Sequence, residues 1–213
     1  MRKPASVKSL EDLGRVRLSK SFFMRDMLYS EISNFHGIPN IPNDPDLAIH
    51  AARQLCETLL EPLQAAFGRL SIRSAYRSPS VNEYGNKNAL NCASSEANYA
   101  AHIFDRRDAE GNAGATATVV VNSFIEYYEQ TGDWQAMAWW IHDNLPPTSL
   151  YFFPKMAAFN ISWHEQPDQT IKIYIAPKGI LTKPEMDNFS GRHEAQYANW
   201  LAAYEKNHRL SVS

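Results

Sequence analysis

The segment Ile72-Arg-Ser-Ala-Tyr-Arg-Ser-Pro-Ser-Val-Asn82 decides how the rest of this chain is interpreted. Residues 70–76 alternate between apolar and polar side chains, a pattern that predicts a short, half-buried strand. The strand is expected to end at Arg77-Ser-Pro, because proline restricts the residue before it and favours a turn. The segment therefore places an arginine directly after a strand.

A long helix is predicted before this strand. Residues 46–67 carry apolar side chains along one stripe, as in an amphipathic helix: Leu47, Ala51, Leu55, Leu59 and Leu63. Pro62 is expected to kink the helix, because proline lacks the amide hydrogen and crowds the preceding turn, and Gly68 is expected to end it. Another helix is predicted over residues 21–32, where Ser21 can act as the N-cap.

The remainder of the chain mixes both kinds of element. Residues 82–98 are polar and rich in asparagine, and we expect a loop. Residues 115–131 begin with a β-branched run but have the length of a helix, and we predict a helix. Another helix is predicted over residues 134–145, with strands at residues 101–105, 150–153, 159–164 and 171–175.

Helices followed by strands mixed with helices indicate an α+β protein with a small, largely antiparallel sheet flanked by helices. The length of 213 residues fits a single domain, which we place at residues 18–176. Residues 1–17 are expected to form a flexible arm. Residues 177–213, with an amphipathic segment at 194–204, are expected to form a C-terminal tail.

Composition restricts the classes of partner. Charged residues make up 21% of the chain and the net charge is −2, with no long basic run, so we expect no nucleic-acid partner. The first residues lack the apolar stretch of a secretion signal, and no segment reaches the length of a membrane span. We therefore expect cytoplasmic synthesis, no membrane partner, and free thiols at Cys56 and Cys92.

The order of these segments resembles the zinc D-Ala-D-Ala carboxypeptidase and L-Ala-D-Glu endopeptidase family, of the hedgehog/DD-peptidase fold. The most specific match is the segment 72–82, which is similar to the family's Ser-Gly-Tyr-Arg-Ser-x-x-x-Asn. Three further pieces agree in order, at residues 18–30, 37–42 and 60–68. The resemblance covers roughly residues 18–176 and implies a hedgehog/DD-peptidase-like fold.

The same resemblance locates the family's metal ligands. Its motif Ser-x-His-x-x-Gly-x-Ala-x-Asp, aligned on Asp105, puts Asn98 where the family has a histidine ligand. The second histidine, in a late strand, corresponds to Asn160. The stretch 150–158, where the family has its catalytic glutamate, contains no carboxylate.

These replacements alter the chemistry that the resemblance implies. A catalytic zinc site uses three protein ligands and one open position, and a neutral amide is a weak ligand for zinc. Loss of a general base costs a factor of about 10²–10⁴ in rate. We therefore expect no zinc, and predict a peptidase-like binding or structural module for a peptidoglycan stem peptide or another short peptide. Bacterial or phage origin, release by lysis and an assembly partner for the C-terminal tail complete this interpretation.

Arg77 matches the family's arginine that faces the substrate's carbonyl or carboxylate. A guanidinium suits a carboxylate because it can donate two parallel hydrogen bonds. The alternative is that Arg77 pairs with a neighbouring acid and fixes the loop. The predicted substrate-binding residues are Ser74, Arg77, Asn82, Asn98, Asp105, Asn160 and Ser162.

A rearranged zinc site is the alternative to a site without metal. Side chains alternate along a strand, so Asn160, Ser162 and His164 are expected on one face, with His164 directed toward the family's metal position. With a bulge in the preceding strand, His102 and Asp105 or Asp108 could join His164. The chain would then be an active zinc peptidase that cleaves peptidoglycan stem peptides.

His142 is predicted to be packed or on the surface, and His193 shows no signal in the sequence.

Overall fold

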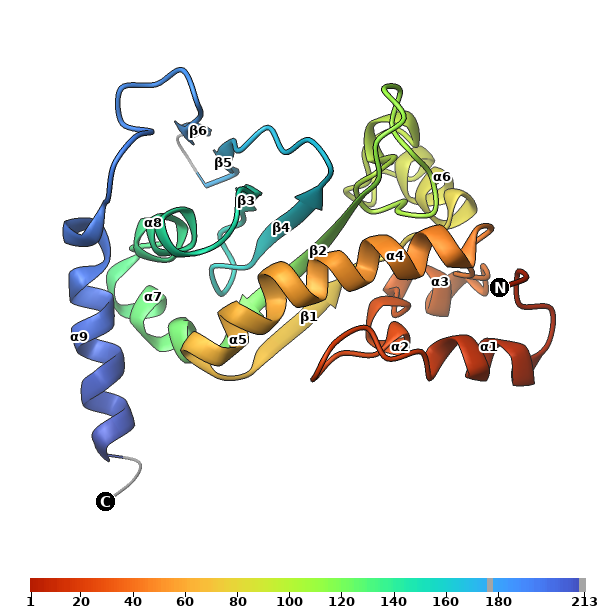
Figure 1. Ribbon diagram of the computed structural model, residues 1–213, viewed down its shortest axis with the longest axis horizontal. Helices are drawn as coiled ribbons and strands as arrows, with labels where there is room; N and C mark the ends of the chain where they lie inside the picture. Colours follow the sequence, from red (N-terminus) through yellow and green to blue (C-terminus); the bar gives the residue numbers. More distant parts are fainter. Residues whose placement is uncertain (176–177, 211–213) are drawn as a thin grey trace. The chain divides into compact units, whose positions relative to one another are not determined.

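The computed structural model describes residues 1–175 and 178–210, and the chain forms two compact units (Figure 1). Unit 1 contains residues 1–61, 72–118 and 162–167. Unit 2 contains residues 62–71, 119–161 and the chain from residue 168 onward. Each unit is described by itself below.

Six strands form one open sheet, in the order β1-β2-β4-β3-β5-β6, that is mostly antiparallel. The β3–β5 pair is parallel, and the β5–β6 pair is antiparallel with an irregularity at residues 171–172. The prediction of an α+β protein with a small, largely antiparallel sheet is confirmed. The strands are β1 (Leu70–Ser74), β2 (Gly114–Val121), β3 (Ser149–Phe152), β4 (Phe159–His164), β5 (Ile171–Ile173) and β6 (Gly179–Thr182).

The predicted long helix is present and contains a π-helical turn. Helix α4 (Pro45–Leu55) continues through η1 (Cys56–Leu60) into α5 (Glu61–Phe67). Pro62 lacks an amide hydrogen, and its ring would clash with the carbonyl group four residues earlier in a regular helix. The amide of Glu61 instead bonds to the carbonyl of Cys56, which widens the turn before the proline. A π-helical turn is therefore found just before Pro62, where we predicted a kink.

Short helices make up much of unit 1: α1 (Val7–Gly14), α2 (Met24–Met27), α3 (Glu31–His36), α6 (Pro79–Lys87) and η2 (Glu96–Asn98). Helix α1 lies within the segment predicted as a flexible arm. Ser6 caps it through the amide of Ser9, and Leu13 is fully buried. Helix α6 takes up the start of the predicted loop at residues 82–98, because Ser78 supplies the N-cap and Pro79 suits the first turn.

The predicted strand at residues 101–105 is wrong. These residues form a compact turn in which the amides of Ala101 and Ile103 both bond to the carbonyl of Asn98. Ile103 and Phe104 are buried inside the turn, so their apolar character reflects burial rather than alternation. Gly114 allows β2 to begin against this turn, because a Cβ atom there would lie 2.1 Å from the carbonyl oxygen of Ala100.

The predicted helix over residues 115–131 is only half right. Residues 114–121 form β2, and a helix appears only over η3 (Asn122–Phe124) and α7 (Ile125–Thr131). Side chains on both faces of β2 are buried, which suits its run of Thr and Val residues.

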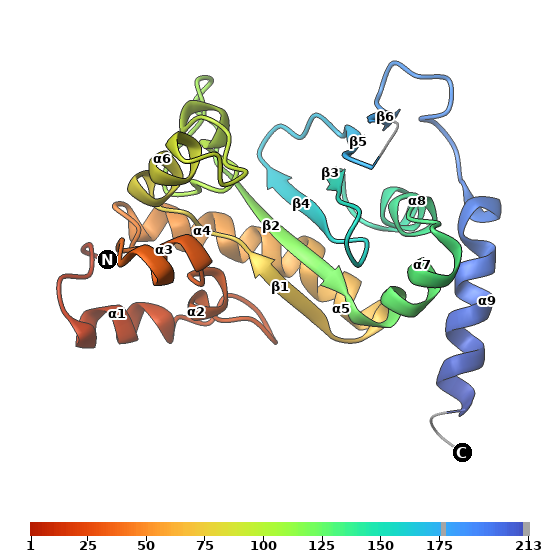
Figure 2. The same cartoon turned by 180° about the vertical axis from the view of Figure 1, so that it is seen from behind.

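Unit 2 is built around α8 (Gln135–Asn144), which confirms the predicted helix, and α9 (Glu194–Leu210), which packs beside it (Figure 2). Trp200 of α9 is 1% exposed. Its indole contacts the rings of Phe67, Phe124 and Tyr127. The segment predicted as a tail therefore supplies part of the unit 2 core, through α9. The predicted boundary at 176/177 lies outside the described residues.

The free thiols are confirmed, with Cys56 buried and Cys92 half-buried. Within the described residues, no helix combines the length and apolar character required to cross a bilayer.

Candidate functional site

Arg77 lies directly after β1 in unit 1, and its guanidinium is half-buried. Nη1 donates to Asn82 Oδ1 at 3.4 Å and to Cys92 Sγ at 3.2 Å. Burial lowers the pKa of Arg77 from its usual value, because the surroundings disfavour the charge. In the described part of the chain no carboxylate forms an ion pair with this guanidinium, but the charge of Glu31 acts on it and opposes the lowering of its pKa, so the alternative of a neighbouring acid stays open.

Two predicted asparagines meet beside Arg77. Asn82, on α6, is fully buried, and Asn98, at the end of η2, is 7% exposed. Asn98 Nδ2 donates to Asn82 Oδ1 at 3.1 Å and to the carbonyl of Ala93 at 3.4 Å. The structure thus brings Arg77, Asn82 and Asn98 together. Their role in binding stays a prediction.

Asp105 lies nearby in unit 1 and is 2% exposed. Its Oδ2 accepts the amide of Asn43 at 2.6 Å, whereas Oδ1 has no partner. The hydroxyl of Tyr76 forms no hydrogen bond of good geometry, but Asp105 lies close enough to act on it: burial, followed by Asp105, raises the pKa of that phenol. Asp105 therefore anchors the loop at Asn43 through one oxygen only.

His102 is buried next to these groups. Nδ1 lies 2.8 Å from the carbonyl of Ala75, so Nδ1 carries the hydrogen and Nε2 presents a lone pair without a partner. Burial, together with Arg77, lowers the pKa of His102 to about 3. The ring is therefore neutral near pH 7.

Two of the positions that the resemblance assigns to metal ligands in this unit take part in hydrogen bonds. The amide nitrogen of Asn98 donates to oxygen acceptors, so only its Oδ1 could ligate a cation. Asp105 accepts the amide of Asn43 through its Oδ2. The expectation that no zinc binds here stays a prediction.

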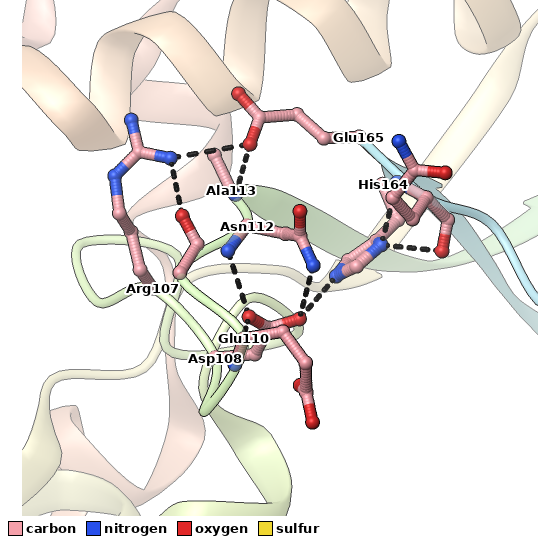
Figure 3. A network of polar contacts seen from close by, with 9 residues as sticks. Arg107, Asp108, Glu110, Asn112, Ala113, His164 and Glu165 are labelled. Carbon is pink, nitrogen blue, oxygen red and sulfur yellow. Dashed lines mark hydrogen bonds and ion pairs between the residues drawn. The ribbon is translucent and has the colours of Figure 1, made fainter.

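His164, the last residue of β4, contacts the loop that contains Asp108 (Figure 3). Its Nε2 lies 3.0 Å from Asp108 Oδ2, and its Nδ1 lies 2.7 Å from the carbonyl of Gln166. Asp108 also accepts the amides of Glu110 and Asn112 through Oδ1, which shapes the loop. His164 therefore contacts Asp108, one of the acids considered for the rearranged site. His102, Asp105 and His164 do not form a group of potential ligands.

The same loop is tied to the residue that follows β4. Glu165 Oε2 accepts the amide of Ala113 at 2.7 Å and Arg107 Nη1 at 3.1 Å (Figure 3). The Ala113 hydrogen bond, assisted by Arg107, lowers the pKa of Glu165. These contacts hold the charged loop at residues 106–113 against the end of β4.

The remaining predicted residues are spread out. Ser74 ends β1 and is half-buried, and Asn160 is half-buried within β4. Ser162 Oγ lies 2.8 Å from Thr116 Oγ1 on β2, so it links two strands. For these three residues a substrate role stays a prediction.

A group in unit 2 could hold a metal ion. In the described residues, His142, Asp143 and His193 are the one set of three or more potential ligands whose donor atoms all lie within 4.8 Å of one another. The Asp143 side chain is fully buried, and its Oδ1 lies 3.0 Å from His142 Nδ1 and 2.8 Å from His193 Nδ1. Burial raises the pKa of Asp143, but hydrogen bonds from His193 and His142 outweigh it and leave the pKa below its usual value.

Sequence reasoning missed this group because its members are far apart in the chain. His142 and Asp143 are adjacent on α8, and His193 precedes α9 by one residue, 50 positions after Asp143. No standard spacing of metal ligands links them. The one signal available was the His142-Asp143 pair on a helix rich in tryptophan.

Comparison with protein-family models finds no match, and comparisons with curated proteins and with solved structures find no significant match. The resemblance to the zinc peptidase family therefore stays an expectation. Two groups of residues stand out in the structure: the half-buried Arg77 guanidinium with neutral hydrogen-bond partners in unit 1, and the His142-Asp143-His193 group in unit 2.

Proposed function

We propose that the chain is a peptide-binding module, without standard zinc catalysis, whose Arg77 receives a carboxylate of the ligand. The single observation that carries this proposal is the half-buried guanidinium whose protein partners are the neutral groups Asn82 and Cys92. A cation taken out of water without a counter-charge is costly, and an anionic ligand removes that cost.

The surroundings of Arg77 support recognition by hydrogen bonding. Nη1 is held by Asn82, whose Oδ1 is in turn held by Asn98, so this edge of the guanidinium is fixed. A planar guanidinium that is already held in place loses little conformational entropy when it binds a carboxylate. A peptidoglycan stem peptide or another short peptide with a free carboxylate fits this requirement, and the resemblance over residues 72–82 points to the same class.

The alternative is an active zinc peptidase that uses His102, Asp105 and His164. The unpartnered atoms His102 Nε2 and Asp105 Oδ1 favour it, but the engagement of His164 with Asp108 does not. Zinc that purifies with the protein and is lost in both His164→Ala and Asp105→Asn variants, together with cleavage of muropeptides, would favour this alternative over the binding module.

Calorimetric titration with two ligands tests the proposal. One ligand is a short stem peptide ending in a free D-Ala carboxylate, and the other is the same peptide with a C-terminal amide. A hydrogen bond to a charged group contributes about 1.5–3 kcal/mol, so the amide is expected to bind roughly 10-fold to 100-fold more weakly. Arg77→Gln is expected to remove this preference.

Arg73→Gln is the matched control, because Arg73 is an exposed arginine on β1 and its loss changes the net charge equally. The control should keep both affinities. Equal binding of acid and amide by the native chain, or an unchanged preference in Arg77→Gln, contradicts the proposal.

A further inference from the structure

In the His142-Asp143-His193 group of unit 2, a neutral His193 has too few hydrogens to donate to both of the acceptors that its ring nitrogens face. His193 Nε2 lies 2.9 Å from the carbonyl oxygen of Asn188, so Nε2 must carry a hydrogen. In a neutral imidazole, Nδ1 then bears a lone pair. That lone pair faces Asp143 Oδ1 at 2.8 Å, which is also electron-rich. A second proton or a cation between the two atoms is required.

His142 adds a second nitrogen to the same point. Its Nδ1 lies 3.0 Å from the same Oδ1 of Asp143, so two imidazole nitrogens converge on one carboxylate oxygen. The exposed fractions of the His142 and His193 side chains are 15% and 13%. Three donor atoms of the types that zinc prefers therefore meet in a mostly buried place.

The outer contacts are those that orient metal ligands. Ligating histidines usually donate their other ring hydrogen to a carbonyl or carboxylate, as His193 does to Asn188. Asp143 Oδ2 accepts the amide of His193 and the hydroxyl of Tyr197, which leaves Oδ1 directed at the two imidazoles. The ring of His193 is also stacked on Trp139, with centroids 3.9 Å apart.

We propose that His142, Asp143 and His193 bind one Zn²⁺ ion, which ties α8 to the start of α9. With metal–ligand bonds of about 2.0–2.1 Å, tetrahedral ligands lie about 3.3 Å apart, so the separations of 2.8 and 3.0 Å need to lengthen by only a few tenths of an ångström. His142 also lines a cavity of about 300 Å³ with Phe189, Ser190 and Gly191, which gives room for a water molecule as the fourth ligand.

Zinc binding and thermal unfolding of the full chain test this site. After removal of metal with a chelator, titration with Zn²⁺ is expected to give one ion per chain and to raise Tm, because a ligand that binds only the folded state stabilises it. His193→Gln is expected to abolish both effects. His36→Gln is the matched control, since His36 is exposed in unit 1 and pairs with Tyr84.

Magnetic resonance of the native chain gives a second measurement in case His193→Gln does not fold. Zn²⁺ should move the Nδ1 signals of two histidines to metal-bound values and leave their Nε2 hydrogens in place. Absence of zinc binding with an unchanged Tm would show that a proton joins the three groups, and would overturn the proposal. Undiminished binding in a folded His193→Gln variant, or equal loss in His36→Gln, would place the ion elsewhere and overturn it too.

Discussion

The carboxyl group of Asp105 is held through one oxygen only. Oδ2 accepts the amide of Asn43, whereas Oδ1 is buried without a partner. Arg77 presents the opposite case, a cation with neutral partners. Buried polar atoms without a hydrogen-bond partner, such as Asp105 Oδ1, are uncommon in folded proteins because burial removes their hydrogen bonds to water. Asp105 and the Arg77 guanidinium both belong to unit 1, and we therefore place ligand recognition there.

Two substitutions at Asp105 should separate its hydrogen bond from its charge. Asp105→Asn keeps an oxygen acceptor for Asn43 and is expected to change the free energy of unfolding by less than about 1 kcal/mol. Asp105→Ala leaves the Asn43 amide unsatisfied and should cost about 1–3 kcal/mol. Urea unfolding followed by circular dichroism measures both. Equal destabilisation by the two variants would mean that the charge itself is required, as it is for a metal ligand.

At the scale of elements, the two wrong predictions concern segments of apolar and β-branched residues, whose sequences fit both a strand and another structure. The β-branched residues of Thr116–Val121 favoured a strand, but length favoured a helix, and burial on both faces of β2 decided for the strand. Residues 101–105 are largely apolar and were predicted as a strand, yet they have no strand partner beyond a single bridge between Tyr99 and Ile103. Whether a segment becomes a strand depends on the segments that pair with it, and these cannot be inferred from its own sequence.

The loop over residues 106–113 should respond to acid through Glu165. The folded pKa of Glu165 is lowered by the Ala113 amide and Arg107, so this carboxylate stabilises the loop above its unfolded pKa of about 4.3, and the stabilisation is lost as pH falls through the lower folded value. The amide proton shift of Ala113, followed from pH 6 to 2, should titrate with a midpoint below about 4.3. Glu165→Gln should remove the titration, and a midpoint at or above that value would contradict the assignment.

At the scale of the whole molecule, periodicity predicted the α+β class, the helix over residues 46–67 and three late strands. The family resemblance, not periodicity, placed Arg77, Asn82 and Asn98 in one predicted site, and these three residues do meet. The group His142, Asp143 and His193 could not be predicted, because its ligands come from two helical regions brought together by tertiary packing. The contribution of α9, within the tail predicted at residues 177–213, was missed for the same reason, since α9 is polar on average and, among its described side chains, Tyr197 and Trp200 are the buried hydrophobic ones.

Trp200 tests whether the C-terminal segment is part of the core or an appendage. Its indole lies between Phe67 and Phe124, and its Nε1 hydrogen has no partner. Trp200→Ala removes a large buried ring and should lower the free energy of unfolding by about 3–5 kcal/mol. Trp200→Phe keeps an aromatic ring and removes the unpaired N–H group, so its cost should be clearly smaller. Tyr29→Ala, at an exposed ring, is the control and should stay within about 0.5 kcal/mol of the native chain. An appended tail would instead leave the unfolding midpoint unchanged in Trp200→Ala, because no core would lose its contacts.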